Sequence, residues 1–220
     1  MPAEEEIMNR SYDHMIFCDF DGTITTEETF VESLMRICGR ENLEEWFGKF
    51  QRREITLRVC TETLFSLVPS EKYALLEEYA KTIQVRPGFS AFLDTAASLD
   101  IPVVVISGGI RRMQEEILRP YSAKILELYS CELDTSGPMM VFRSPYASTE
   151  ENMSKETVMG LYNYKRAICI GDSVTDNRMA EHSDVVFARD MLAADLRKQG
   201  RPFYEWASFD DIAGMLQKVL

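Results

Sequence analysis

Hydrophobic residues along this chain fall into short β-branched runs that alternate with amphipathic segments. The runs near 14–20, 101–106, 166–170 and 184–187 are typical of buried strands, and a weaker one lies near 202–205. Segments with helical spacing follow them near 88–99, 110–118, 152–162, 174–181, 190–199 and 208–219. This alternation predicts parallel βαβ units, and therefore an α/β fold with a doubly wound parallel sheet.

Residues 27–86 break the alternation because they have a helical pattern throughout. We predict a helical cap domain at 27–86, inserted after the first strand, and an α/β core domain formed by residues 1–26 and 87–220. A shorter insert near 129–146 is predicted to be a hairpin, with turn residues at 134–137.

Two acids, Asp19 and Asp21, stand at the end of the first predicted strand, and Gly22 and Thr23 follow at once. Open α/β sheets build their sites at the carboxyl ends of strands. Paired carboxylates there suit a metal ion and a nucleophile, while a glycine amide and a threonine hydroxyl suit phosphate oxygens. The plainer alternative is a polar turn, since Asp and Gly favour turns for local reasons.

Polar residues also follow the later strands. Ser107 and Gly108 end the second, and Asp172 and Asp176 end the third with a spacing of four residues, so both acids can face one point. Lys155 opens an amphipathic helix between these segments. Each has a structural alternative: a strand-to-helix turn for the serine, a solvated helix face for the lysine, and a favourable charge in a first helical turn for Asp176.

In order, these segments resemble the four motifs of the haloacid dehalogenase-type phosphatases: Asp19-Phe20-Asp21-Gly22-Thr23, Ser107-Gly108-Gly109, Lys155, and Gly171-Asp172-Ser173-Val174-Thr175-Asp176. The helical insert after the first motif is similar to the subgroup that contains phosphoserine phosphatases. Within it, the fourth motif and the residues that follow look most like the methionine-salvage enzymes that dephosphorylate 2-hydroxy-3-keto-5-methylthiopentenyl 1-phosphate. The resemblance covers about residues 14–220.

This resemblance implies an Mg²⁺-dependent phosphomonoester hydrolase that works through an aspartyl-phosphate intermediate. Asp19 would be the nucleophile and Asp21 the general acid and base. The implied metal ligands are Asp19, the backbone carbonyl of Asp21, Asp172 and, through water, Asp176. The implied phosphoryl ligands are Lys155, the hydroxyls of Thr23 and Ser107, and the amides of Gly22 and Gly108.

The cap would select the substrate. In the phosphoserine phosphatases a glutamate and an arginine hold the substrate's amino and carboxylate groups, and Glu28 and Arg58 are the matching residues here, with Arg52 and Arg53 as rivals for the arginine. Glu28 could instead start a cap helix. The fourth motif departs from the Gly-Asp-Gly-Ala-Asn-Asp usual in phosphoserine phosphatases, which favours the methionine-salvage ester.

A thioether substrate would want an apolar surface, and the cap offers five candidates: Phe30, Met35, Trp46, Phe47 and Phe50. Hydrolysis of phosphoserine remains the first alternative. Transfer of the phosphoryl group to an alcohol and a non-catalytic phosphate-binding module are two others.

Composition narrows the class of partner. The formal net charge is −12, and no basic run offsets it, which argues against nucleic acid and anionic membranes and leaves a small phosphorylated metabolite as the expected partner. The five cysteines are scattered and without Cys-x-x-Cys spacing, which predicts reduced thiols in a cytoplasmic protein and makes zinc a poor candidate. The sequence does not decide between a monomer and a homodimer.

Overall fold

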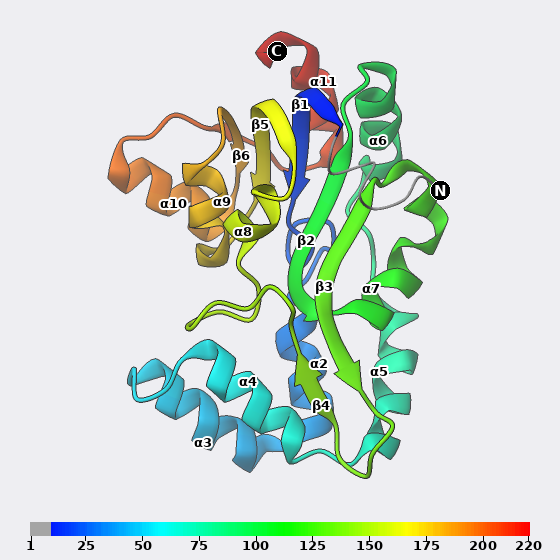
Figure 1. Cartoon of the computed structure of the whole chain (residues 1–220), viewed down its shortest axis with the longest axis vertical. Coiled ribbons are helices and arrows are strands. Elements are labelled where there is room, and N and C mark those ends of the chain that lie inside the picture. The colour runs from blue at the N-terminus through cyan, green and yellow to red at the C-terminus, as the bar shows by residue number, and fades with distance from the viewer. Residues whose placement is uncertain (1–9) are drawn as a thin grey trace.

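The computed structural model describes residues 10–220, and within that range a seven-stranded sheet forms the centre of the molecule (Figure 1). The strands are β1 (Ser11–Cys18), β2 (Val103–Ile110), β3 (Glu127–Asp134), β4 (Val141–Arg143), β5 (Asn163–Gly171), β6 (Val185–Ala188) and β7 (Tyr204–Glu205). They lie in the order β4-β3-β2-β1-β5-β6-β7, and only β4 is antiparallel to its neighbour. The predicted parallel α/β sheet is confirmed.

Both faces of this sheet are covered by apolar side chains. Along β1, Met15 and Phe17 pack into one hydrophobic core, whereas Ile16 and Cys18 pack into the other. Helices α6 (Phe89–Ser98) and α11 (Phe209–Val219) cover the face of Ile16, and α8 (Lys155–Met159), α9 (Asn177–Glu181) and α10 (Asp190–Gln199) cover the opposite face. Burial on both sides explains why the strands were continuous apolar runs in the sequence.

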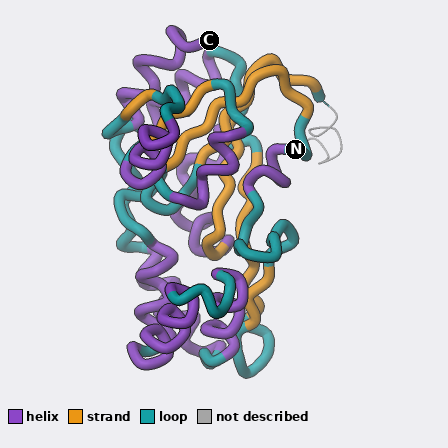
Figure 2. The backbone as a smooth tube through the Cα atoms, turned by 90° about the vertical axis from the view of Figure 1, so that its left-hand side faces the viewer, coloured by secondary structure: helices purple, strands orange, loops and turns teal. Residues whose placement is uncertain are grey.

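Four helices lie together at one end of the molecule, beyond the carboxyl ends of the central strands (Figures 1 and 2). They are α2 (Thr29–Cys38), α3 (Arg40–Gln51), α4 (Leu57–Ser66) and α5 (Tyr73–Ala80). Two segments lead to and from them side by side, because Thr25 and Val85 form a β-bridge and the amide of Thr26 donates to the carbonyl of Gln84 (3.1 Å). The predicted domain boundaries fall in these two segments, and the division into core and cap stays a prediction.

The predicted hairpin forms, but it is also part of the main sheet. The first half of β3 pairs in parallel with β2, whereas Glu132–Asp134 pair with Val141–Arg143 of β4. The amide of Met140 then donates to the carbonyl of Val68 (2.9 Å), which ties the hairpin to the segment after α4. A hydrophobic pattern predicts a strand without naming its neighbours, so the pairing with β2 was not foreseen.

Several elements differ in length from their predictions. The segment predicted as a helix at 152–162 is helical only over Lys155–Met159, with Ser154 as its N-cap and Gly160 as its C-cap. The segment at 174–181 divides into a 3₁₀ turn, Val174–Asp176, and the short helix α9. Helix α7 (Arg111–Leu118) follows β2, and further 3₁₀ turns occupy Ser70–Lys72 and Arg119–Lys124. None of the helices found between residues 10 and 220 has the length and apolar character needed to cross a membrane.

Candidate active site

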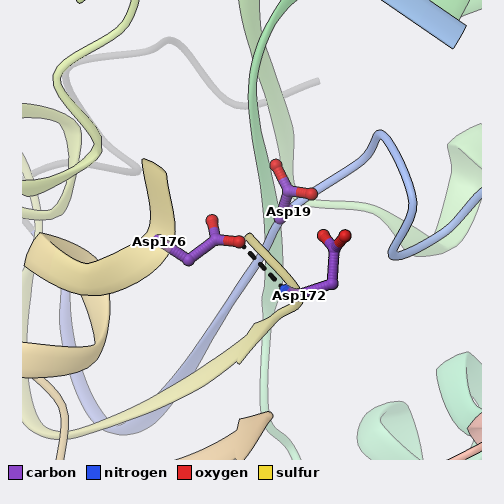
Figure 3. A group of neighbouring side chains, drawn as sticks. All are labelled: Asp19, Asp172 and Asp176. Carbon is purple, nitrogen blue, oxygen red and sulfur yellow. Dashed lines mark hydrogen bonds between the residues drawn. The ribbon is translucent and has the colours of Figure 1, made fainter. Parts of the chain in front are cut away.

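Three carboxyl groups converge at the carboxyl edge of the sheet (Figure 3). Asp19 directly follows β1, Asp172 directly follows β5, and Asp176 ends the 3₁₀ turn after β5. One oxygen from each lies within 4.8 Å of the others, and all three side chains are buried. Because β1 and β5 are adjacent parallel strands, their ends meet at the same edge, as the sequence predicted.

Lys155 joins this cluster from the first residue of α8. The hydroxyl of Ser154 accepts the amide of Thr157 and so caps the helix that carries the lysine. The Lys155 Nζ donates to Oδ1 of Asp19 and to Oδ1 of Asp176 (2.5 Å), and only 3% of the lysine is exposed. Burial lowers the pKa of Lys155, but the two carboxylates more than offset this and hold it above its usual value. The lysine therefore supplies a fixed positive charge.

One ammonium does not balance three carboxylates. Burial and the charge of Asp176 raise the pKa of Asp19 well above its usual range, and the same two causes raise that of Asp172 to about 6. Asp172 has no cationic partner among the residues the structure describes. Buried carboxylate oxygens with an excess of negative charge fit a hard divalent cation such as Mg²⁺.

Asp176 differs from the other two acids in how its oxygens are used. Its Oδ2 accepts the amides of Asp172 and Ser173, both at 3.0 Å, while Oδ1 accepts from Lys155. A Cβ on Gly171 would lie only 2.6 Å from Cγ of Asp176, so glycine is needed there for this approach. Asp176 therefore holds the loop that carries Asp172.

Asp21 lies beside the cluster and is partly exposed. The hydroxyl of Thr29 donates to its Oδ1, and the hydroxyl of Ser107 donates to its Oδ2 (3.2 Å). Desolvation raises the pKa of Asp21, and these two hydrogen bonds oppose the shift. Asp21 thus has the surroundings of an acid that can hold or release a proton beside Asp19.

Gly22 and Thr23 do not present the phosphate-binding groups expected from the sequence. The Gly22 amide donates to Oγ1 of Thr25 (3.0 Å) and to the carbonyl of Glu27 (3.1 Å), and the buried Thr23 hydroxyl donates to Oδ1 of Asp172 (2.8 Å). Gly22 is instead needed for its shape: its φ is +73°, and a Cβ there would lie 2.5 Å from Oδ2 of Asp172. Both residues hold the loop in place in this conformation.

A cavity of about 180 Å³ opens onto the site. Its polar wall includes Asp19, Asp21, Glu28, Gly108 and Lys155. Its apolar wall is formed by Phe30, Val31, Phe47, Leu57 and Met153. Desolvation and the charge of Asp172 raise the pKa of Glu28 to about 7. The structure therefore brings Glu28 and two of the five predicted apolar residues to the site.

Arg58 is not brought to this cavity. Its Nε donates to Glu62 (2.8 Å), and its side chain also reaches the carbonyl of Ser148 (3.3 Å). The rival Arg52 is paired with Glu54 (2.6 Å). A contact from Arg58 to a substrate stays a prediction that this conformation does not support, because helix α4 directs the side chain to its own next turn.

Three residues at the site were missed in the sequence. Arg86 donates to the carbonyls of Thr23 (2.9 Å) and Gly22 (2.6 Å) and so clamps the loop after Asp21. Asn152 lines the cavity, and its buried amide oxygen has no hydrogen-bond partner between residues 10 and 220. Gln114 is buried and donates to Ser107 (2.6 Å). Of these three residues, only Gln114 could have been found from the sequence, because it is a polar residue on the apolar face of a predicted helix.

Comparison with known proteins agrees with this geometry. Residues 16–181 match the family model described as haloacid dehalogenase-like hydrolase. The 2-hydroxy-3-keto-5-methylthiopentenyl-1-phosphate phosphatase of Microcystis aeruginosa is 36% identical over 200 residues, which cover 90% of this chain and 95% of the relative. The protein of the same name from Brevibacillus brevis is 30% identical, over 93% of this chain and 96% of its own length.

The fold is shared with solved structures at much lower identity. A probable phosphoserine phosphatase from Vibrio cholerae superposes with a TM-score of 0.72 at 15% identity, covering 97% of this chain and 68% of the other. Such a likeness supports the fold alone. The family model and the relatives at 36% and 30% identity show the family as well as the fold. They confirm the resemblance found in the sequence motifs: the chain belongs to the haloacid dehalogenase-like hydrolases.

Proposed function

We propose that the protein is an Mg²⁺-dependent phosphatase that hydrolyses a small phosphate monoester through an aspartyl-phosphate on Asp19, and that 2-hydroxy-3-keto-5-methylthiopentenyl 1-phosphate, of methionine salvage, is its substrate. The observation that carries the proposal is the meeting of Asp19, Asp172 and Asp176 with the buried ammonium of Lys155. The names of the relatives from Microcystis and Brevibacillus support the choice of ester.

The metal would be held by Asp19, Asp172 and the backbone carbonyl of Asp21. Asp176 would support it indirectly, because both of its oxygens already accept hydrogen bonds from the chain. When bound, Mg²⁺ would offset the negative charge of the phosphoryl group and of the acids around it.

The chain's own residues would carry the two chemical steps. In the first, a carboxylate oxygen of Asp19 bonds to phosphorus while the bond from phosphorus to the ester oxygen breaks, and Asp21 gives its proton to that oxygen. In the second, Asp21 takes a proton from water as the water oxygen bonds to phosphorus, and the bond to Asp19 breaks to release inorganic phosphate. Lys155 offsets negative charge throughout, and the Ser107 hydroxyl and Gly108 amide are the proposed donors to phosphoryl oxygens.

The cavity supports a small substrate with an apolar end. Its volume of about 180 Å³ is below the roughly 300–1,000 Å³ of pockets that hold drug-sized ligands. The aromatic side chains of Phe30 and Phe47 come from α2 and α3 and line the same cavity as the acids, so a methylthio group could pack against them. Residues 27–86 would accordingly act as the cap domain, over a core formed by 1–26 and 87–220.

Phosphoserine is the second candidate substrate because Glu28 lines the cavity, where a carboxylate could bind an amino group. The position of Arg58 speaks against it, since its guanidinium is paired with Glu62. No described cation other than Lys155 lines this cavity to bind the serine carboxylate.

Phosphate release with Mg²⁺, measured as kcat/KM across a panel of esters, tests the proposal. The panel contains the methylthiopentenyl ester, O-phosphoserine and sugar phosphates. A preference of about 100-fold for the first, which corresponds to about 2.7 kcal/mol in the transition state, would support it. Preference for O-phosphoserine would instead support the second candidate, and turnover that rises when an alcohol acceptor is added would indicate phosphoryl transfer.

The nucleophile is tested by Asp19→Asn. We expect kcat to fall by about 10⁴-fold or more, since the amide cannot form the phosphoryl intermediate. Asp13→Asn is the matched control, because Asp13 lies in an exposed pair with Lys165. Activity in Asp19→Asn within tenfold of wild type, a threshold of about 1.4 kcal/mol, would contradict the assignment.

A further inference from the structure

A bulge in β2 places Ser107 at the site. Ile106 pairs with Tyr129 and Ile110 pairs with Cys131, so three residues of β2, 107–109, face the single residue Ser130 of β3. A bulge bends its strand and re-aims a side chain. Here it turns the amide of Gly109 back onto Oγ of Ser107 (3.0 Å).

A buried chain of hydrogen bonds runs from Ser130 to Asp21. The Ser130 hydroxyl donates to Oε1 of Gln114, Nε2 of Gln114 donates to Oγ of Ser107 (2.6 Å), and the Ser107 hydroxyl donates to Oδ2 of Asp21 (3.2 Å). The two serines and the glutamine are each at most 2% exposed, so bulk water does not compete for these groups.

The direction of this chain follows from its end. When Asp21 is ionised its carboxylate only accepts hydrogen bonds, so in that state Ser107 donates to Asp21 and accepts from Gln114. The amide side chain of Gln114 must then present Nε2 to Ser107 and Oε1 to Ser130. With Gly109 as a second donor, both lone pairs of the Ser107 oxygen are occupied. The hydroxyl proton of Ser107 is therefore directed to Oδ2 of Asp21, a residue that lines the cavity.

We propose that Gln114 is a positioning residue that, held by Ser130, fixes the Ser107 hydroxyl as a donor directed into the active site. The donor serves Asp21 in the structure and a phosphoryl oxygen when phosphate is bound. This inference rests on the proposed phosphatase function, although it concerns phosphate binding and not turnover.

The local backbone is adapted to this arrangement. A Cβ on Gly109 would lie 2.5 Å from Nε2 of Gln114 and 3.3 Å from Oγ of Ser107. Glycine at 109 thus leaves the space through which the glutamine reaches the serine. Gln114 is also a polar residue among the buried apolar side chains of α7, Met113, Ile117 and Leu118, where packing alone would favour another aliphatic residue.

The test measures the affinity for inorganic phosphate, by calorimetry with Mg²⁺ present, from pH 6 to 9. In Gln114→Glu the side chain keeps its shape, but an ionised carboxylate accepts from Ser107 and turns the hydroxyl away from the site. We expect phosphate affinity to fall by about 10- to 100-fold relative to wild type at the same pH, at least at the upper end of the range where Glu is ionised. Gln114→Met removes both polar atoms and should lower phosphate affinity less than Gln114→Glu does. The exposed Gln199→Glu is the control for an added negative charge.

The same two substitutions in a Ser107→Ala background separate positioning from other effects. If Gln114 acts through the serine hydroxyl, neither substitution should weaken phosphate binding further once that hydroxyl is absent. An equal loss in both backgrounds would indicate charge repulsion or distortion and would overturn the inference. So would wild-type affinity in both Gln114 variants across the whole pH range.

Turnover adds a separate readout. Wild-type protein that binds phosphate but hydrolyses no ester would refute the proposed function and leave the Gln114 inference standing. Failure of the wild type to bind phosphate would overturn both. Thermal unfolding of each variant shows whether it is folded, and Gln114→Met keeps the test open should the glutamate variant fail to fold.

Discussion

The charge of Lys155 is expected to be the main electrostatic support of the folded site when no metal is bound. The Lys155 Nζ lies 2.5 Å from Asp176 and also contacts Asp19, and all three side chains are buried. At an effective dielectric constant of about 20, the contact with Asp176 corresponds to about 7 kcal/mol of attraction. Most of this offsets the several kcal/mol that burial of an ammonium costs.

Lys155→Met removes the charge but keeps much of the apolar stem. It leaves three carboxylates within 4.8 Å of one another with no cation among them. Breaking a buried pair from one side costs about 3–5 kcal/mol, because the other charge stays buried and unpaired. For a chain of this length we expect the melting temperature to fall by about 6–20 °C.

The loss should depend on pH in a defined direction. Burial and Asp176 already raise the pKa of Asp19 above its usual value, and loss of the lysine would raise it further. An acid with a raised folded-state pKa binds more protons in the folded chain than in the unfolded one, so stability falls as pH rises. The deficit of the variant should therefore be largest near pH 8 and shrink toward about pH 5, as the buried acids take up protons.

Urea unfolding with EDTA present, at the two pH values, measures this effect. Lys81→Met is the matched control, since Lys81 pairs with Glu78 at 2.6 Å on the exposed surface, and no measurable change in stability is expected for it. A loss below about 1 kcal/mol for Lys155→Met at pH 8, or a deficit that does not shrink on acidification, would refute the reasoning.

Two further substitutions test the shape of the site. Gly22→Ala should cost about 1–3 kcal/mol of stability and lower kcat/KM by about 100-fold, because Gly22 has a positive φ and an added Cβ would lie 2.5 Å from Asp172. Gly200→Ala is the control: Gly200 has φ of +67° but open space around it, so this variant should lose stability and keep its activity. Phe47→Ala should lower kcat/KM for the methylthio ester by about 10- to 200-fold and leave kcat/KM for O-phosphoserine unchanged. An equal loss on both esters would contradict a role in specificity. So would the same pattern in the control Phe50→Ala, whose ring packs beside Phe47.

Much of the site could be predicted because each motif is local. The acids of β1 and β5 directly follow apolar runs, and parallel strands carry such residues to one edge of the sheet. Lys155 begins a helix that Ser154 caps, and a hydroxyl residue before a helical pattern is visible in the sequence. The strand ends placed Asp19 and Asp172 at this edge, and the grouping of Asp19, Asp172 and Asp176 around one metal was implied by the family resemblance.

For other predicted residues, the partner of the polar group was decided by the tertiary structure. Thr23 donates to Asp172, which lies 149 residues further along the chain, and the Gly22 amide is used within its own loop. The Arg58 side chain pairs with Glu62 on its own helix and does not reach the cavity. A motif gives the residue type and its element, but not which of several acceptors its donor will meet.

By itself the sequence determined the alternation of strands and helices, the helical insert and the acidic strand ends, because these depend on periodicity and on residues close together in the chain. Only the tertiary structure decided the order of the strands, the pairing of β3 with both β2 and β4, and the bulge that lets Gln114 reach Ser107. The physical reason is that buried polar groups must find partners where packing leaves them, and those partners are set by contacts between residues far apart in the sequence.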